Sequence, residues 1–363
     1  MRIAIDASAV AEPRRTGIGN YVRSLLRCLS ELDTENQYYI CHRFSRLRHW
    51  GSFVRVPRPN FHNKIIHEPF NPFFMRRLDV FHGPDARLPR SAAVKKVVTC
   101  HDIASLLTDA YADEKFRRMK VERYEHIAGE ATRIIATSES TRRDMARHLR
   151  VDARKITVIP LGVSDDFHPR PPEEVAAIRT RLGLEKDFLL SVGVVTRRKN
   201  TRRVIEAFHA VSKGRDIQLV LAGRRGYGWQ EELAPIEELG LKDKVRLLGY
   251  VADEDLPPLY SAARAVVFPS LYEGFGIPLV EAMACGTPVV TSNCSSLPEV
   301  AGDAALLVDP YDTEAIAEAA RRLLDDEALR QALRARGIER AKLFPWSRTA
   351  RDTLQVYREV AGA

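Results

Sequence analysis

The chain contains no long apolar run. No segment of its 363 residues approaches the roughly 18 consecutive apolar residues of a transmembrane helix. Asp6 interrupts the first apolar segment, which therefore has the pattern of a strand rather than of a signal-peptide core. The hydrophobic fraction of 45% is nevertheless sufficient for two cores. We therefore expect a cytoplasmic protein with two α/β domains of ordinary size.

Cysteine is scarce and scattered. The five cysteines are odd in number and form no C-x-x-C pair, which argues against a disulfide framework or a zinc site and fits a reducing compartment. No D-x-D pair ends an expected strand, and the sequence lacks H-E-x-x-H and G-x-x-x-x-G-K-S/T motifs. Asp165 and Asp166 are adjacent, but they lie in a linker without other metal ligands. The sequence therefore excludes a phosphate-loop ATPase, and we expect neither a metal nor a cofactor.

Acidic residues are under-represented in the first half of the chain. Residues 1–165 contain 29 Lys and Arg against 19 Asp and Glu, a net charge of +10, whereas the remainder contains 27 against 29, a net charge of −2. This asymmetry suggests an anionic partner for the first half: an anionic membrane surface, a lipid-phosphate acceptor or nucleic acid. No nucleic-acid-binding motif is present, so nucleic acid is not expected. Arginine-rich solubility is the alternative explanation.

Strand and helix patterns alternate along both halves, which is typical of open parallel sheets. Strands are expected at 2–6, 38–41, 79–82, 97–100, 134–137, 156–160, 188–192, 217–222, 244–248, 265–268, 288–291 and 305–308. Helices are expected at 20–32, 115–130, 139–149, 200–212, 230–239 and 277–285, and a helical region near 313–340. Residues 44–76 have weak periodicity and are expected to form a mobile, partly helical excursion. We predict an N-terminal domain over 1–165, a C-terminal domain over 166–345 that faces it across a cleft, and a final helix over 346–363.

The second half contains two glutamates eight positions apart, in Glu273-Gly274-Phe275-Gly276-Ile277-Pro278-Leu279-Val280-Glu281, between two apolar strands. Such βαβ units bind ligands where a strand meets its helix. The first amides of a helix lack partners and attract anions. A phosphate at the amides of Gly276 and Ile277 would leave Glu273 in the loop and Glu281 about one turn along the helix, so that one carboxylate can meet a sugar and the other a ribose. An ordinary helix with a solvated Glu281 is the alternative.

Two other turns carry residues suited to phosphate. Gly17 and Gly19 follow the first strand, and glycine permits positive φ and close approach of the backbone to an anion, although a plain tight turn explains them equally well. Arg198 and Lys199 follow the first strand of the second half. Arginine offers a planar fork and lysine a point charge to a diphosphate, both as bound substrate and as leaving group. Solvated cations are the alternative there.

The string from Glu273 to Glu281, followed by A-M-A-C-G-T-P-V-V, closely resembles the E-x7-E signature of glycosyltransferase family 4, retaining enzymes that use nucleotide sugars. The resemblance extends over nearly the whole chain, from the first glycine turn to the closing Pro345-Trp346 helix. It implies a GT-B fold, with two facing Rossmann-like domains and a C-terminal helix that crosses back to the first. One departure is Val194, which occupies a position where many members have arginine.

The resemblance also implies roles for individual residues. Arg198 and Lys199, with the loop of Gly17 and Gly19 and the amides of Gly276 and Ile277, would hold the donor diphosphate. The donor sugar would contact Glu273, Gly274 and Phe275, the ribose would contact Glu281, and the nucleobase would contact the backbone of the segment that ends at Val251. His101, which follows a buried strand, would face the donor sugar and stabilise developing positive charge, with Asp102 to orient it. A core histidine is the alternative.

The implied activity is metal-independent transfer of a sugar, with retention of configuration, from a nucleotide-diphosphate donor to a saccharide acceptor. The T-G-I-G start and the R-K-N loop resemble bacterial polysaccharide mannosyltransferases and favour GDP-mannose, while UDP- and dTDP-linked sugars stay open. The basic first half favours a lipid-linked saccharide acceptor at the inner membrane face, in surface polysaccharide synthesis. A nucleotide-sugar epimerase, which would isomerise the donor alone, and a non-catalytic nucleotide-sugar sensor, which would not hydrolyse it, remain alternatives.

Overall fold

The computed structural model describes residues 1–11, 17–67, 72–89 and 94–362. These residues divide into two compact units. Unit 1 consists of residues 1–107, 115–162 and 345–363, and unit 2 consists of residues 108–114 and 163–344. The short segment 108–114, which the sequence assigns to the first domain, therefore groups with the second. The reason is that the 3₁₀ helix η3 (Asp109–Tyr111) packs against the 3₁₀ helix η5 (Arg197–Lys199).

Within the described residues, unit 1 is built on a sheet of seven parallel strands in the order β3-β2-β1-β4-β5-β6-β7. Its strands are β1 (Arg2–Asp6), β2 (Gln37–Arg43), β3 (Phe61–Ile66), β4 (Val80–Gly83), β5 (Lys95–Cys100), β6 (Arg133–Ala136) and β7 (Ile156–Val158). Its helices are α1 (Gly17–Leu32), α2 (Pro72–Met75), α3 (Ala104–Leu107), α4 (Glu114–Glu130), α5 (Glu139–His148) and α15 (Trp346–Ala361), with 3₁₀ helices η1 (Ser8–Ala11), η2 (Phe44–Ser52) and η4 (Ala153–Lys155).

Unit 2 repeats the architecture with six parallel strands among its described residues, in the order β10-β9-β8-β11-β12-β13. These are β8 (Asp187–Val192), β9 (Ile217–Ala222), β10 (Val245–Gly249), β11 (Ala265–Phe268), β12 (Val289–Ser292) and β13 (Leu306–Val308). The helices are α6 (Pro172–Leu182), α7 (Thr201–Val211), α8 (Trp229–Leu233), α9 (Pro235–Glu238), α10 (Leu256–Ala262), α11 (Ile277–Ala284), α12 (Leu297–Ala301), α13 (Thr313–Asp325) and α14 (Glu327–Ala341). In both sheets the strand order reverses once, which makes them Rossmann-like.

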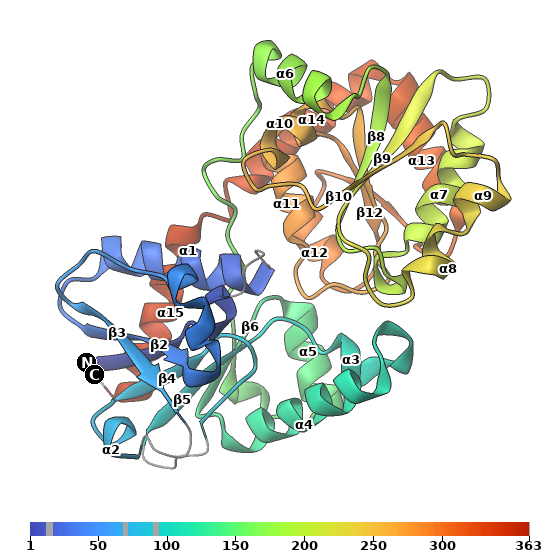
Figure 1. Cartoon of the computed structure of the whole chain (residues 1–363). Helices are drawn as coiled ribbons and strands as arrows, with labels where there is room; N and C mark the ends of the chain where they lie inside the picture. Colours follow the sequence, from blue (N-terminus) through green and yellow to red (C-terminus); the bar gives the residue numbers. More distant parts are fainter. Residues whose placement is uncertain (12–16, 68–71, 90–93, 363) are drawn as a thin grey trace. The chain divides into compact units, whose positions relative to one another are not determined.

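The last helix, α15, belongs to unit 1 although it follows the whole of unit 2 in the chain. Figure 1 shows it beside α1, at the opposite end of the colour scale. Its apolar face buries Leu354, Tyr357 and Val360, the residues that its helical spacing predicts. The Thr349 hydroxyl donates to the Pro160 carbonyl at 2.8 Å. The predicted return of the final helix to the first domain is therefore confirmed.

Two sequence-based expectations need correction. Residues 44–76 are not simply a partly helical excursion, because Phe61–Ile66 forms the edge strand β3, which pairs with β2. The helical region expected near 313–340 is confirmed and consists of two helices, since the Asp326 carboxylate accepts a hydrogen bond from the Leu329 amide at 2.8 Å and caps the second. The first helix starts at Gly17 rather than near Asn20. Residues 12–16 of the expected glycine loop lie outside the described residues.

The described helices include none with the length and apolar character needed to cross a membrane.

Candidate active site

A cluster of charged side chains in unit 2 lies where the strand order of its sheet reverses, between β8 and β11. Open α/β sheets bind ligands outside the carboxyl ends of their strands at such switch points. The chain leaves β8 through Gly193, whose φ of +147° is a conformation that L side chains rarely adopt. A Cβ at this position would lie 3.3 Å from Lys199 Cε, so glycine lets the lysine pass close to the backbone. Arg198 and Lys199 follow in η5.

Glu273 is the centre of this cluster. It is 7% exposed, and each of its carboxylate oxygens accepts a hydrogen bond from a cation. Arg198 Nη1 donates to Oε2 at 2.9 Å and Lys199 Nζ donates to Oε1 at 2.6 Å. Burial by itself raises the pKa of Glu273, but Arg198 and Lys199 outweigh it and lower the pKa to about 2. Glu273 is therefore a fixed anion at neutral pH, and it holds both cations in place.

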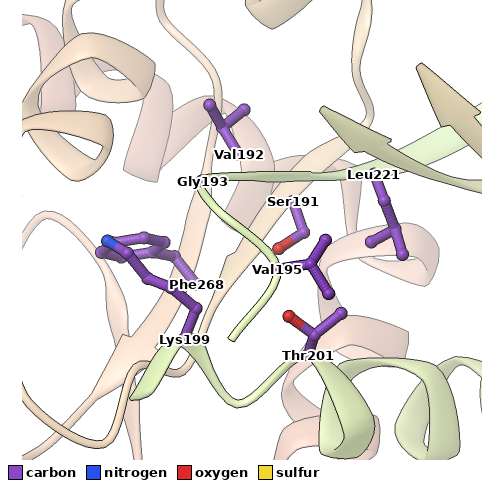
Figure 2. Close-up of a pocket in the computed structure, with 8 residues that line it drawn as sticks. All are labelled: Ser191, Val192, Gly193, Val195, Lys199, Thr201, Leu221 and Phe268. Carbon is purple, nitrogen blue, oxygen red and sulfur yellow. The ribbon is translucent and has the colours of Figure 1, made fainter. Parts of the chain in front are cut away.

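Lys199 also borders a small pocket lined by Ser191, Val192, Gly193, Val195, Lys199, Thr201, Leu221 and Phe268. Figure 2 shows the lysine side chain beside the Phe268 ring, with Nζ 4.6 Å from the ring centroid. A cation at this distance from an aromatic face is attracted by the ring's electron density. Lys199 is thus positioned by an anion and an aromatic ring at the mouth of the pocket, where its charge can meet a phosphate.

Two serines that the sequence did not point to hold the backbone of Glu273. Ser295 Oγ accepts a hydrogen bond from the Glu273 amide at 3.0 Å, and Ser296 Oγ donates to the Glu273 carbonyl at 2.9 Å. Both serines lie after β12, more than 20 residues further along the chain. Sequence spacing alone carries no signal for this contact, because it depends on the pairing of β11 with β12.

Helix α11 begins at Ile277, four residues after Glu273, as the sequence predicts. Gly276 has a φ of +103°, and a Cβ there would lie 2.7 Å from Leu297 Cδ2, so only glycine fits this helix start. Within the described part of the chain, the amides of Gly276 and Ile277 donate to no protein acceptor. Phe275 is buried and packs edge-on against Phe344, with ring centroids 5.5 Å apart. The helix start therefore presents two amides suited to an anion.

Glu281 lies further along α11 and has a different environment from Glu273. The buried Tyr260 donates its hydroxyl hydrogen to Glu281 Oε2 at 2.9 Å. Burial of the carboxyl among protein atoms raises the pKa of Glu281 to about 7, while the Tyr260 hydrogen bond partly opposes this and the nearby Asp253 adds to it. Glu273 is thus ionised at neutral pH, whereas the pKa of Glu281 lies close to neutral pH. Tyr260 was not predicted from the sequence.

The structure gives less information on the ligand contacts predicted for Val251 in unit 2 and for Gly17 and Gly19 in unit 1. Val251 lies in the loop after β10, the same loop that carries Asp253 and so borders Glu281. Gly17 and Gly19 lie in the first turn of α1. Their expected contact with the donor phosphates stays a prediction.

His101 follows β5 in unit 1 and is half-buried. Its ring meets Tyr21 edge-on, with centroids 4.9 Å apart, and Nε2 lies 2.9 Å from the Pro84 carbonyl oxygen. Because a carbonyl only accepts, Nε2 carries the proton. Burial lowers the pKa of His101, which favours the neutral ring with an unprotonated Nδ1. The orienting partner is therefore Pro84 rather than Asp102, whose carboxylate accepts from the Ala104 amide.

The residues that the structure describes contain no group of three or more His, Cys, Asp or Glu side chains arranged to hold a metal ion. In the site around Glu273, the groups arranged to meet a diphosphate are Arg198, Lys199 and the helix amides.

The chain is similar to known proteins over most of its length. Residues 175–340 match the model described as glycosyl transferases group 1, and residues 15–167 match that of glycosyltransferase family 4. The chain is 38% identical over 285 residues to O-antigen chain mannosyltransferase B from Escherichia coli, covering 77% of this chain and 74% of that protein. It is 30% identical over 266 residues to the serotype-specific mannosyltransferase WbdA from E. coli, covering 70% of this chain but 32% of that longer protein.

Among solved structures, sucrose-phosphate synthase from Thermosynechococcus elongatus has the same fold. Its TM-score is 0.79 at 24% sequence identity, and the match covers 99% of this chain and 98% of that one.

Proposed function

Because the chain belongs to the group 1 glycosyltransferases, with a family 4 N-terminal region, we propose that it transfers mannose from GDP-mannose to a saccharide acceptor in bacterial surface polysaccharide synthesis. The names of two relatives, an O-antigen chain mannosyltransferase and a serotype-specific mannosyltransferase, support mannose as the sugar. GDP is the nucleotide that the Arg198-Lys199-Asn200 loop favours by resemblance.

The observation that carries the proposal is the cluster of Arg198, Lys199 and Glu273 at the ends of β8 and β11. Two cations held beside a helix start with available amides provide a site for a diphosphate, both as bound donor and as leaving group. Because Glu273 neutralises about one of the two positive charges, the site is positive without a ligand but is not strongly self-repelling. The proposed chemistry therefore requires no metal ion.

The two glutamates have separate roles in this proposal. Glu273, with the backbone of Gly274 and Phe275, accepts hydrogen bonds from hydroxyls of the donor sugar. Glu281 accepts from the ribose hydroxyls, while the Tyr260 hydroxyl donates to its Oε2 and holds the carboxylate in place. The nucleobase lies along the loop of Val251. The same loop carries Asp253, which is close enough to Glu281 to raise the pKa of that carboxyl.

The proposed reaction retains the anomeric configuration. No side chain in the cluster is placed as a covalent nucleophile, since Glu273 is engaged with two cations. The acceptor hydroxyl would attack the face that the diphosphate leaves, and the leaving phosphate would take its proton. A neutral His101 with Nε2 tied to Pro84 would stabilise positive charge at the breaking bond through Nδ1 or its backbone carbonyl.

A lipid-linked acceptor would require unit 1 to approach a membrane, and one segment has suitable chemistry. Phe44, Leu47 and Trp50 in η2 are 54%, 40% and 60% exposed. They are spaced by three residues, the repeat of a 3₁₀ helix, although the backbone kinks at His49. Residues 36–67 contain six Lys and Arg and no Asp or Glu. Exposed aromatic and aliphatic side chains among arginines suit the interface of an anionic bilayer.

The test begins with thermal shifts across GDP-, UDP-, dTDP- and ADP-linked sugars, because a bound donor raises apparent stability by mass action. Transfer is then followed with the stabilising donor, and the anomer of the product is determined by NMR. Glu273→Gln is expected to lower turnover by roughly 100-fold or more while GDP affinity stays within severalfold. The matched control is Glu173→Gln, at an exposed position in α6.

Several outcomes would contradict the proposal. Stabilisation by no nucleotide sugar, isomerisation of the donor without an acceptor, an inverted product, or equal turnover in Glu273→Gln and Glu173→Gln would each be inconsistent with it.

A further inference from the structure

One segment of the chain belongs to a different unit from the residues on both of its sides. Residues 108–114 group with unit 2, whereas residues 1–107 and 115–162 form part of unit 1. We call residues 108–114 the strap. Both ends of the strap continue directly into unit 1, so a displacement of the strap acts on that unit through covalent bonds. A ligand that moves the strap in unit 2 can therefore change the conformation of unit 1.

The strap has a defined local structure and contacts the basic turn of the candidate site. Its 3₁₀ helix η3 is capped by Thr108, whose hydroxyl accepts a hydrogen bond from the Ala110 amide at 3.2 Å. Such a cap satisfies an amide at the start of a helix that would otherwise lack a partner. Helix η3 packs against η5, which carries Arg198 and Lys199. The strap thus lies against the turn that would hold the donor diphosphate.

Tyr111, the last residue of η3, lies close to this turn. Its side chain is half-buried. Burial raises the pKa of Tyr111, the nearby Tyr311 adds to this, and the charge of Arg198 opposes it. Cys294 acts on the same hydroxyl, and the residue after it is the serine that holds the Glu273 amide. Tyr111 is therefore a neighbour of both Arg198 and the segment that fixes Glu273.

Arg198 must be held in place to meet a diphosphate. Its Nη1 donates to the Tyr272 carbonyl at 2.8 Å and to Glu273 Oε2 at 2.9 Å, and its own carbonyl accepts from the Leu271 amide at 2.8 Å. Its side chain is 25% exposed. A packed neighbour such as Tyr111 restricts the rotamers of this long side chain. Less conformational entropy is then lost when the arginine binds an anion.

On its N-terminal side the strap is joined to His101 by a short run of structured backbone. The Asp102 carboxylate accepts a hydrogen bond from the Ala104 amide at 3.0 Å, and α3 follows. Ile103 is fully buried in a core cluster of unit 1. Helix α3 leads directly into the strap. The run consists of bonded turns rather than a slack loop, so a shift of the strap reaches His101 through few flexible bonds.

We propose that the strap couples the donor diphosphate site to His101, with Tyr111 as the positioning residue that acts through Arg198. This inference rests on the proposed function and adds a regulation of the same site. A diphosphate that draws Arg198 towards it changes the surface on which η3 packs. The strap follows this change, and His101 takes up its working position only when the donor is bound. Two sites are coupled when one element has two arrangements that both of them bias.

The first test measures GDP affinity of the full chain by calorimetry. We expect Tyr111→Ala to weaken GDP binding about tenfold, but to have less than about a twofold effect in an Arg198→Gln background, because a positioning residue acts only through the group that it positions. Tyr111→Phe keeps the ring and should bind GDP like the wild type. Tyr111→Leu replaces the alanine variant if that variant does not fold. Tyr227→Ala, at a position 55% exposed in unit 2, is the matched control and should also bind like the wild type.

Hydrogen exchange followed by mass spectrometry separates coupling from folding. Saturating GDP should slow the exchange of the backbone amides of residues 101–107 in the wild type but not in Tyr111→Ala. A purely structural tyrosine would instead raise the exchange of this segment equally with and without GDP. Helix α5, which also belongs to unit 1, is the internal control, and its exchange should not respond to GDP.

The outcomes distinguish this inference from the proposed function. Equal GDP affinity of Tyr111→Ala and the wild type, additive effects of Tyr111→Ala and Arg198→Gln, or exchange of residues 101–107 that does not respond to GDP would each overturn the coupling and leave the proposed function in place. A wild type that does not bind GDP would contradict both. Coupled GDP binding without transfer of mannose from GDP-mannose would refute the proposed function and leave the coupling in place.

Discussion

Glu273 and Glu281 show how the same side chain acquires opposite properties from its neighbours. Glu273 lies between Arg198 and Lys199, and these charges outweigh its burial and lower its pKa to about 2. Glu281 is close to Tyr260 and Asp253, with no directly bonded cation, and burial raises its pKa to about 7. The first carboxylate is suited to hold cations and hydroxyls at any physiological pH. The second becomes charged most readily when hydroxyl donors approach it.

The raised pKa of Glu281 predicts a pH-dependent stability. Its ordinary pKa of 4.5 applies to the unfolded chain, so folding favours the protonated form. The contribution of protonated Glu281 to the free energy of unfolding is fully present below pH 4.5, and it is lost as the pH rises through about 7. Glu281→Gln cannot ionise, and its stability relative to the wild type should rise over this interval by on the order of 3 kcal/mol. Denaturant unfolding between pH 4.5 and 8 measures this, and parallel pH profiles of the two proteins would contradict it.

Removing the charge at this position should also weaken GDP binding at neutral pH, because a glutamine accepts hydrogen bonds from the ribose less strongly than a carboxylate. Glu173→Gln again provides the control.

At the scale of elements, a buried polar network attaches the final helix to unit 1. The Tyr21 hydroxyl and His82 Nε2 both lie 2.9 Å from Thr99 Oγ1, and His82 Nδ1 lies 2.6 Å from the Tyr357 hydroxyl. All four side chains are nearly or fully buried. The network joins α1, β4, β5 and α15, so His82 has a structural role. It also positions Tyr21, which packs against His101.

Tyr357→Phe is expected to leave His82 Nδ1 without its partner in a buried site. The free energy of unfolding should fall by about 1–3 kcal/mol, the usual cost of an unsatisfied buried polar group. Chemical denaturation of the full chain measures the change. Tyr311→Phe, at a position 62% exposed, should have no comparable effect. An unchanged stability of Tyr357→Phe would show that the network does not contribute to the attachment of α15.

At the scale of the whole molecule, charge is divided between the two halves of the chain. The net charge is +10 over residues 1–165 and −2 over the remainder. Part of the excess lies around the exposed side chains of η2, since residues 36–67 contain six Lys and Arg and no Asp or Glu.

The charge around η2 predicts binding to anionic vesicles. Trp50 is 60% exposed, and its fluorescence should shift to shorter wavelength with phosphatidylglycerol vesicles but not with phosphatidylcholine vesicles. Arg46→Glu with Arg48→Glu should weaken binding at least tenfold, since each basic residue near the surface contributes about 1 kcal/mol. Lys213→Glu with Lys242→Glu makes the same change in net charge in unit 2 and should bind normally. A shift absent from wild type, or lost equally in both double variants, would exclude this surface.

The sequence by itself determined the alternating parallel architecture and the positions of Arg198, Lys199, Glu273 and Glu281, because these depend on local signals: apolar runs, glycine turns and a continuous motif. The sequence-based prediction was wrong where a turn signal and a helix signal overlap. Gly17 and Gly19 have the composition of a turn, but they lie in α1, where the buried apolar face of the following residues stabilises the helix.

Only the tertiary structure decided which distant residues meet. Tyr260, Ser295 and Ser296 contact the two glutamates because β11 lies between β8 and β12, and Asp85 pairs with Lys120 because the turn after β4 lies close to α4. Such contacts join residues tens of positions apart with no fixed spacing. The physical reason is that chain folding, rather than local conformation, sets the distances on which hydrogen bonds and charge interactions depend.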